Sequence, residues 1–251
     1  MKQRDWLNVL FSDERIVAVE KPANLATIPG RGETDSLLEK LARQLGIPCR
    51  GTDDPRLRVV HRLDKGTSGV LLMARDIAAQ RHLSHQFQNN QLRKEYLAIV
   101  FGKPEMDEGT IDAPLGPNPG SKDRMMVSKH GRASRTDWKV EKRMRRFTLV
   151  RCFPKTGRTH QIRVHLRSIG LPLAVDELYN SRAAGAAVGI FLSEFKRDYS
   201  PTAGQDERAL ISRLTLHAER LGFVHPDGRE MVIECPLPKD FRAAITQLSK
   251  L

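Results

Sequence analysis

One short stretch of this chain, bounded on each side by an apolar run, reads His61-Arg62-Leu63-Asp64-Lys65-Gly66-Thr67-Ser68-Gly69. The apolar runs, 57–60 and 70–74, are typical of strands. A carboxylate between two strands would lie at the lip of a rigid sheet, where catalytic groups are commonly placed. The alternative is an ordinary turn with a capping aspartate, and the stretch alone does not separate the two interpretations.

The charge of the chain favours a polyanionic partner. Its 251 residues include 42 lysines and arginines against 30 aspartates and glutamates, which gives a net charge of +12. Such a balance points first to RNA or DNA, with an acidic membrane surface as the rival. However, no apolar run approaches the roughly 18 residues needed to span a bilayer, and residues 1–10 lack the apolar core of a signal peptide. We therefore expect a cytoplasmic protein that binds nucleic acid and no membrane.

The cysteines and histidines indicate neither a disulfide nor a metal site. Cys49, Cys152 and Cys235 are widely scattered, and no pair has the spacing of metal ligands. His160 and His165 are five residues apart, so they would not share one face of a helix. We expect no metal.

Apolar periodicity and turn residues predict an α+β fold on a mixed, mostly antiparallel sheet. Strands are expected at 16–20, 95–101, 136–141 and 147–153, with a closing hairpin around 226–228. Helices are expected after the capping residues Ser36, Asp76 and Thr159, and at 241–248. We expect one catalytic domain over 1–251, in which 181–212 is an inserted surface segment.

Asp64 is the first candidate for chemistry. An ionised and fixed carboxylate can serve as a nucleophile or as a general base. A cation within about 4–6 Å would hold the carboxylate in its charged form and fix its direction. The possible cations, between which the fold must choose, are Arg62, Lys65, Arg158 and Arg163.

A second candidate is the stretch Gly157-Arg158-Thr159-His160-Gln161-Ile162-Arg163-Val164-His165. A helix that begins after glycine and arginine offers an anion site, which suits an RNA phosphate or a catalytic carboxylate. Arg158 and His160 are therefore candidate RNA contacts. Arg163 could reach back to a carboxylate with its two-pronged guanidinium. The alternative is a basic amphipathic helix whose arginine is solvated.

Two further features fit an RNA-binding site. Tyr96, on a predicted strand, shows its ring to one face, where it is either core or a platform for a nucleobase. The stretch 121–135 is rich in cations, including Arg124 and Arg132, and such loops commonly contact phosphates. A solvated hairpin is the alternative for the second feature.

Together these pieces resemble the RluA-type family of pseudouridine synthases, over roughly residues 10–180 and 212–240. The resemblance rests on 60–64 with 67–69, on Lys94-Glu95-Tyr96, on 157–166, on 169–173 with Asp176 and Tyr179, on 216–218, on 223–226 and on 19–23. The loop around Asp64 and the motif 157–166 are specific in combination, whereas either one alone is only suggestive.

The resemblance implies an enzyme that isomerises uridine to pseudouridine in ribosomal or transfer RNA without a cofactor. It makes Asp64 the essential carboxylate, which either attacks C1′ of the ribose or takes a proton from C2′. Arg163 matches the arginine that pairs with this aspartate. Tyr96 matches the tyrosine that packs on the base and could relay the C5 proton. Arg62 matches a residue that fills the stack once the base has flipped out. Lys65 is a further candidate RNA contact, and we expect a monomer.

This sequence departs from the family pattern in three places. Val175-Asp176 replaces the usual Gly-Asp, which we expect to alter a turn, and 181–212 is longer than the family's pattern. The chain also begins almost directly with the catalytic domain, so we expect the domain itself or the insertion to select the RNA.

Two other functions compete with this interpretation. A non-catalytic RNA-binding protein would explain the charge, but only 6% of the residues are aromatic and no RRM-type signature is present. A nuclease would usually gather several carboxylates around metal ions, whereas Asp64 has no acidic neighbour in its loop.

Overall fold

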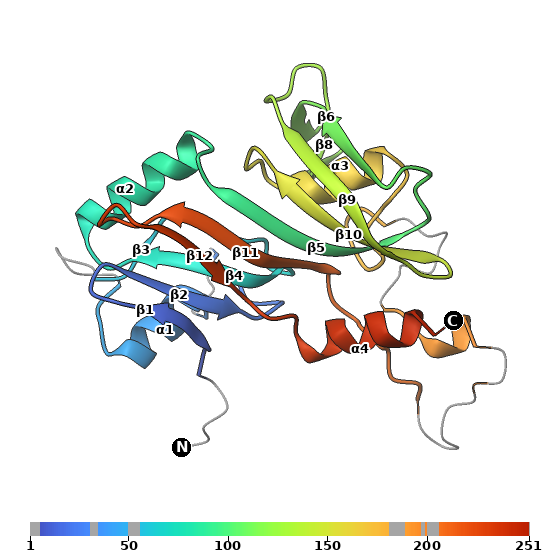
Figure 1. The fold of residues 1–251 in the computed structure, drawn as a ribbon, viewed down its shortest axis with the longest axis horizontal. Helices are drawn as coiled ribbons and strands as arrows, with labels where there is room; N and C mark the ends of the chain where they lie inside the picture. Colours follow the sequence, from blue (N-terminus) through green and yellow to red (C-terminus); the bar gives the residue numbers. More distant parts are fainter. Residues whose placement is uncertain are drawn as a thin grey trace. The chain divides into compact units, whose positions relative to one another are not determined.

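The computed structural model describes residues 6–30, 35–49, 56–180, 189–196, 199 and 206–250. The chain forms two compact units (Figure 1). Unit one comprises Met1–Glu95 and Ala218–Pro236, and unit two comprises Tyr96–His217 and Leu237–Leu251. The chain passes from one unit to the other within strand β5 (Arg93–Phe101) and returns within strand β11 (Leu216–Val224).

Unit one is built on antiparallel strand pairs. Its elements are β1 (Val9–Ser12), β2 (Ile16–Lys21), α1 (Leu37–Leu45), β3 (Arg58–Val59), β4 (Ser68–Ala74), α2 (Ile77–Gln88), most of β11, and β12 (Glu230–Glu234). β4 pairs with β2 and with β3, β1 pairs with β2, and β11 pairs with β12. Every residue of β4 is buried, and α2 packs against β3 and β4. A continuous apolar run is what a strand covered on both faces requires.

The helices of unit one begin where their capping residues predict. Ser36 Oγ accepts the amide of Glu39 at 3.3 Å, and Gly46 ends α1 in the left-handed conformation with a φ of 64°. Asp76 Oδ1 accepts the amide of Ala79 at 2.8 Å and so caps α2. Both cap predictions are confirmed.

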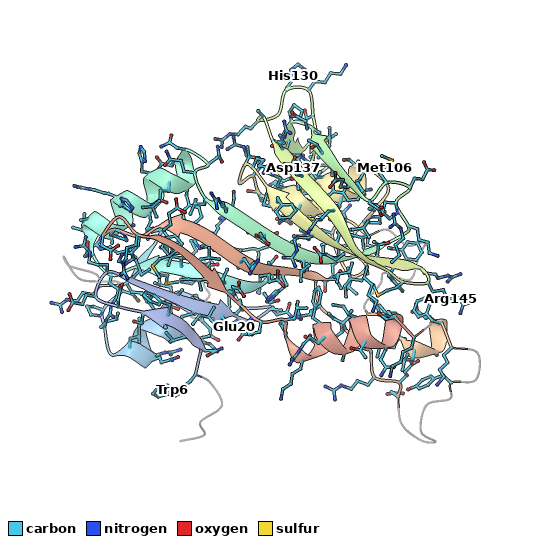
Figure 2. All side chains as sticks on the ribbon, viewed as in Figure 1. Trp6, Glu20, Met106, His130, Asp137 and Arg145 are labelled. Carbon is cyan, nitrogen blue, oxygen red and sulfur yellow. The ribbon has the colours of Figure 1, made fainter. Side chains whose placement is uncertain are left out.

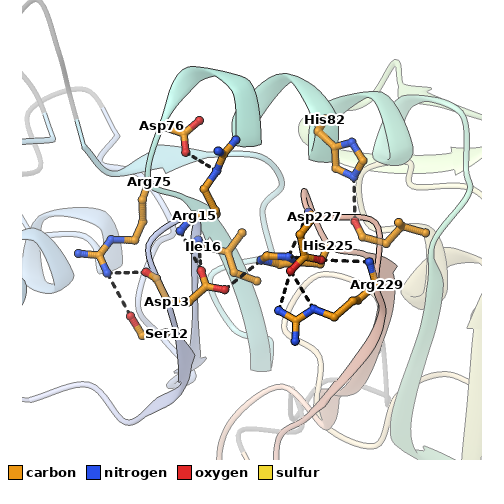
Figure 3. Close-up of polar contacts among 11 residues, drawn as sticks. Ser12, Asp13, Arg15, Ile16, Arg75, Asp76, His82, His225, Asp227 and Arg229 are labelled. Carbon is orange, nitrogen blue, oxygen red and sulfur yellow. Dashed lines mark hydrogen bonds and ion pairs between the residues drawn. The ribbon is translucent and has the colours of Figure 1, made fainter.

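A buried histidine ties the β11–β12 turn to the turn between β1 and β2 (Figure 3). His225 is 2% exposed, and its Nε2 lies 3.0 Å from Asp13 Oδ2 and its Nδ1 lies 2.8 Å from Asp227 Oδ1. Hydrogen bonds from Arg229, with a smaller contribution from His225, hold the pKa of Asp227 well below its usual value. Asp13 Oδ1 also accepts the amides of Arg15 and Ile16, each at 2.8 Å, so the first turn is fixed as well. The predicted closing hairpin is confirmed, and its turn is locked to unit one.

Unit two is also built on antiparallel strand pairs, together with a separate two-stranded hairpin. Its elements are the rest of β5, β6 (Glu108–Asp112), β7 (Leu115–Asn118), β8 (Ser121–Val127), β9 (Arg135–Arg143), β10 (Phe147–Pro154), α3 (Gln161–Ser168), the short 3-10 helix η1 (Leu192–Glu194) and α4 (Lys239–Leu248). β10 pairs with β5 and β9, and β6 pairs with β9. β7 and β8 form the hairpin, and α3 packs against β8, β9 and β10. The loop that follows β8 carries His130 at its exposed tip (Figure 2). The α+β prediction with mostly antiparallel strands is confirmed.

Helix α3 begins differently from the prediction. Its N-cap is His160, in the left-handed conformation with φ 55° and ψ 20°, and no side chain caps the helix. The expected cap at Thr159 is therefore wrong. The side chain of Gln161 closes the turn instead, because its Oε1 accepts from the amide of Arg158 at 3.0 Å and from Thr156 Oγ1 at 2.7 Å.

The segment 181–212 is described only at residues 189–196, 199 and 206–212, and these residues do not lie wholly on the surface. Ile190, Phe195 and Ile211 are buried in a core cluster with Phe147 and Phe241. The amide of Ile190 donates to the carbonyl of Ile211 at 2.9 Å, which closes this segment upon itself. These three residues therefore belong to the core, and the assignment of 1–251 to one catalytic domain with an inserted segment at 181–212 stays a prediction.

Within the described part of the chain, no helix is long and apolar enough to cross a membrane.

Candidate active site

Asp64 lies in the turn between β3 and β4, and its side chain is partly exposed. The buried Leu63 beside it is held by Thr27, whose hydroxyl accepts the amide of Leu63 at 3.3 Å and donates to its carbonyl at 3.2 Å. The carbonyl of Asp64 accepts the amide of Thr67 at 3.0 Å. The backbone on both sides of Asp64 is therefore fixed, as a reactive carboxylate requires.

A buried lysine, Lys21, also holds this turn in place. Lys21 is 0% exposed, and its ammonium donates to the carbonyls of Pro22 at 2.9 Å, Leu25 at 2.6 Å and Lys65 at 2.9 Å. Three carbonyl acceptors match the three N–H donors of an ammonium, which makes a charge tolerable at such depth. Because Lys65 follows Asp64 directly, Lys21 ties the catalytic candidate's loop to the end of β2. The sequence showed Lys21 only as the end of a strand and as part of the family resemblance.

His61, in the same motif, is a structural residue. Its Nε2 accepts the amide of Leu72 at 2.9 Å, and its ring stacks on Phe87 with centroids 4.4 Å apart and an interplanar angle of 15°. Burial, with a smaller contribution from the charge of Lys94, lowers the pKa of His61 to about 3. The imidazole is thus neutral near pH 7, with its proton on Nδ1.

Gly69 ends the motif at a point where two strands touch. Its φ is +127°, and a Cβ built there would lie 2.1 Å from the carbonyl oxygen of Ala218 in β11. No side chain fits this space, so only glycine allows the two backbones to approach this closely. Arg62 and Lys65, two of the candidate RNA contacts, are exposed in the same turn as Asp64.

In unit two, Arg163 is buried in α3 and forms a two-pronged ion pair with Asp176. Its Nε lies 2.8 Å from Oδ2 and its Nη2 lies 2.8 Å from Oδ1. Its guanidinium also lies over the ring of Tyr179, with Cζ 4.9 Å from the centroid. The two-pronged geometry expected of Arg163 is therefore present, with Asp176 as a partner that the sequence reasoning had not assigned. Asp64 and Arg163 belong to different units, and their pairing stays a prediction.

His165, in the same helix, is buried and structural. Its Nε2 donates to the carbonyl of Ala113 at 3.0 Å, so its Nδ1 accepts from the hydroxyl of Thr136 at 2.9 Å. Burial lowers the pKa of His165. The hydrogen bond to the Ala113 carbonyl and the charge of Asp112 raise this pKa, but by less. It is therefore a neutral packing residue.

The remaining candidates of unit two lie on the hairpin, on β5 and at the start of α3. Arg124 is exposed on β8, and Arg158 Nε donates to the carbonyl of Ala133 at 3.2 Å. Burial, followed by the positive charge of Arg132, lowers the pKa of Arg158. Tyr96 lies opposite Cys152 of β10 and is half-buried against a core cluster.

His160 shares a hydrogen bond of 2.8 Å between its Nδ1 and the hydroxyl of Tyr179. Among the residues that the structure describes, no three His, Cys, Asp or Glu side chains are grouped so that they could hold a metal ion.

Comparison with known proteins agrees with the motifs. A family model described as RNA pseudouridylate synthase matches residues 15–168, which is more than half of the chain and includes Asp64, Tyr96 and Arg163. Ribosomal large subunit pseudouridine synthase D of Nitrosomonas europaea is 37% identical over 98% of this chain and 66% of its own length. Ribosomal large subunit pseudouridine synthase C of Escherichia coli K12 is also 37% identical, over 96% of this chain and 69% of its own length.

The fold shows the same relationship. Human RNA pseudouridylate synthase domain containing 4 has a solved structure with a TM-score of 0.69 and 26% identity, covering 96% of this chain and 92% of that one. This chain spans about two thirds of the length of the two bacterial relatives. On the family match and on relatives of this similarity, the chain belongs to the RNA pseudouridylate synthase family.

Proposed function

We propose that this chain isomerises uridine to pseudouridine in RNA, with Asp64 as the catalytic carboxylate. The observation that carries the proposal is the family's aspartate motif on a turn anchored by Thr27 and Lys21. The net charge of +12 supports a polyanionic substrate. The alternative, a non-catalytic RNA-binding protein, would explain the charge. It would not explain why buried contacts fix the loop around one carboxylate.

The reaction is an isomerisation and needs no second reactant. The target uridine first leaves the base stack, as enzymes that act on bases require. Asp64 then attacks C1′ of the ribose or takes a proton from C2′, and the bond between N1 and C1′ breaks. The freed uracil turns and bonds to C1′ through C5. The proton on C5 departs, N1 gains a proton, and the atoms of the base and the sugar are conserved.

The other candidates support this chemistry in named roles. Arg163 pairs with Asp64 and orients it, while Asp176 holds the guanidinium in place through its two hydrogen bonds. Tyr96 packs on the target base and is a relay for the C5 proton, and Arg62 occupies the space that the flipped base leaves. The candidate contacts to the RNA backbone are Lys65, Arg124, Arg132, Arg158 and His160.

The names of the two bacterial relatives point to ribosomal RNA of the large subunit as the substrate to test first. We propose that the protein modifies this RNA as a monomer in the cytoplasm. Sedimentation at micromolar concentration tests the oligomeric state, and the mass of one chain is the expected result.

Release of tritium from C5 tests the proposed activity. A transcript of the large-subunit RNA labelled with tritium at C5 of uridine should lose label to water when the protein is added, because the C5 hydrogen leaves in the last step. Mass spectrometry of the digested RNA should show an equal quantity of pseudouridine. RNA that is bound but retains all of its tritium would favour the non-catalytic alternative.

Replacing Arg163 with lysine should lower kcat by roughly 10- to 100-fold, because a point charge cannot reproduce the guanidinium fork and loses a charge-assisted hydrogen bond. Replacing Asp176 with asparagine should lower kcat in the same direction, since an amide offers only one acceptor oxygen to the guanidinium. Single-turnover rates of tritium release measure both effects. Replacement of Arg167, an exposed arginine of the same helix, with lysine is the matched control and should change little. Equal rates for wild type and Arg163→Lys would argue against the assigned role of Arg163.

A further inference from the structure

Tyr179 lies at the centre of a chain of polar contacts in unit two that the proposed chemistry does not use. The side chain is buried, with 3% of the residue exposed. Its hydroxyl accepts the amide of Met125 in β8 at 2.7 Å and lies 2.8 Å from Nδ1 of His160. Helix α3 and the β7–β8 hairpin pack against each other at this place (Figure 1). One hydroxyl therefore joins the hairpin to the start of the helix that carries Arg163.

The ring and backbone of the same tyrosine serve Arg163. The guanidinium lies over the ring at 4.9 Å, a geometry that gives a favourable cation–π interaction. Asp176, which holds Arg163 at both prongs, also accepts the amide of Tyr179 through Oδ1 at 3.1 Å. Arg163, Asp176 and Tyr179 thus form one connected group, and the tyrosine hydroxyl links this group to the hairpin through Met125.

The hairpin presents positive charge next to the point where the hydroxyl holds it. Lys122 and Arg124 are exposed on β8, and Arg124 directly precedes Met125. Met125 is half-buried, whereas Met126 and Val127, which follow it in β8, are exposed. Met125 packs against a small cluster of Leu115, Val164 and Tyr179. The bond between Met125 and Tyr179, together with the pairing of β8 with β7, therefore fixes the backbone next to Arg124.

The backbone conformation of His160 is a second observation that concerns the contact with Tyr179. It has a left-handed φ of 55°, which side chains other than glycine adopt at a cost in free energy. This backbone conformation places its ring edge-on to Tyr179, with centroids 5.5 Å apart, and brings Nδ1 to the hydroxyl. The hydrogen bond and the ring contact with Tyr179 help to hold this conformation.

We propose that Tyr179 is a positioning residue that couples the basic β7–β8 hairpin to Arg163. Its hydroxyl places the hairpin for the RNA backbone, and its ring and amide keep the Arg163–Asp176 pair aligned. The inference rests on the proposed function, because the hairpin and Arg163 have their roles only if RNA is modified. An ordinary core tyrosine would contribute only to folding. A change in KM without a change in kcat therefore distinguishes a positioning residue from a core tyrosine.

Replacing Tyr179 with phenylalanine tests the coupling, because it keeps the ring over Arg163 and removes the hydroxyl. We expect KM for the tritiated large-subunit transcript to rise roughly five- to tenfold, the effect of losing one or two hydrogen bonds, while kcat changes by less than about twofold. Thr246→Val removes an exposed hydroxyl from α4, also in unit two, and should leave both constants unchanged. A fall in kcat with no change in KM would overturn the coupling to the hairpin.

A measurement on the free protein separates this inference from the proposed activity. Hydrogen exchange at the amide of Met125 should become faster in Tyr179→Phe, because its acceptor is gone, and stay as in wild type in Thr246→Val. Faster exchange in a protein that never releases tritium would refute the proposed function and leave the structural link intact. Turnover by wild type, with unchanged exchange and unchanged KM in Tyr179→Phe, would overturn the inference itself.

A double-mutant cycle keeps the test valid if Tyr179→Phe is less stable. Arg124→Ala should raise KM in the wild-type background and raise it by a smaller factor in the Tyr179→Phe background, because the arginine is then no longer held in place. Equal factors in the two backgrounds would show that Tyr179 does not act through the hairpin.

Discussion

Replacing Asp64 with asparagine is expected to abolish pseudouridine formation, with a fall in rate of more than about 1,000-fold. Asparagine has nearly the shape of aspartate, but its amide neither attacks C1′ nor accepts a proton from C2′. The contacts of Thr27, Lys21 and Thr67 that shape the loop use main-chain atoms of residues 63–65, so the variant keeps them. RNA affinity should therefore remain close to that of wild type.

Single-turnover tritium release measures the rate, and filter binding of the same transcript measures the affinity. Asp35→Asn is the matched control, since Asp35 is an exposed carboxylate of unit one that forms ion pairs with Lys40 and Arg43. The control should show wild-type rates. Turnover by Asp64→Asn within tenfold of wild type would remove Asp64 from the catalytic role.

Replacing Gly69 with alanine is expected to destabilise unit one by at least about 3 kcal/mol. Two costs add here: a φ of +127°, and a Cβ placed 2.1 Å from the carbonyl oxygen of Ala218. The neighbour is backbone of β11, so it cannot move aside as a flexible side chain would. The midpoint of urea unfolding, followed by circular dichroism, measures the loss.

Gly228→Ala separates the two costs of that substitution. Gly228 also has a positive φ, +93°, but a Cβ there would meet nothing within 4 Å. This variant should lose only about 1 kcal/mol, the cost of the backbone conformation. If both variants lost the same free energy of unfolding, the close contact between Gly69 and Ala218 would not be what holds the motif in place.

Local signals in the sequence predicted the elements whose causes are local. Ser36 and Asp76 cap their helices with amides three residues away, and Gly46 ends α1 through its own backbone freedom. The start of α3 was missed because its cause is distant. The conformation of His160 is tied to the hydroxyl of Tyr179, 19 residues further on.

The supports of the candidate site were missed for the same physical reason. Lys21 stabilises the carbonyl of Lys65 across 44 residues of chain, and no periodicity or spacing reports such a contact. For Arg163 the sequence indicated the catalytic carboxylate as partner, which stays a prediction. The two-pronged pair with Asp176 was missed, because Asp176 was seen only as part of a turn. The Ala- and Gly-rich composition of 181–212 concealed Ile190, Phe195 and Ile211, whose burial depends on α4 and β10.

The most direct test of the account is a map of pseudouridines in the RNA of cells with and without this gene. We expect at least one pseudouridine in large-subunit ribosomal RNA to disappear with the gene, to return with the wild-type copy and to stay absent with Asp64→Asn. Identical maps in the presence and absence of the gene, or restoration of the site by Asp64→Asn, would contradict the assignment of this chain as an Asp64-dependent pseudouridine synthase.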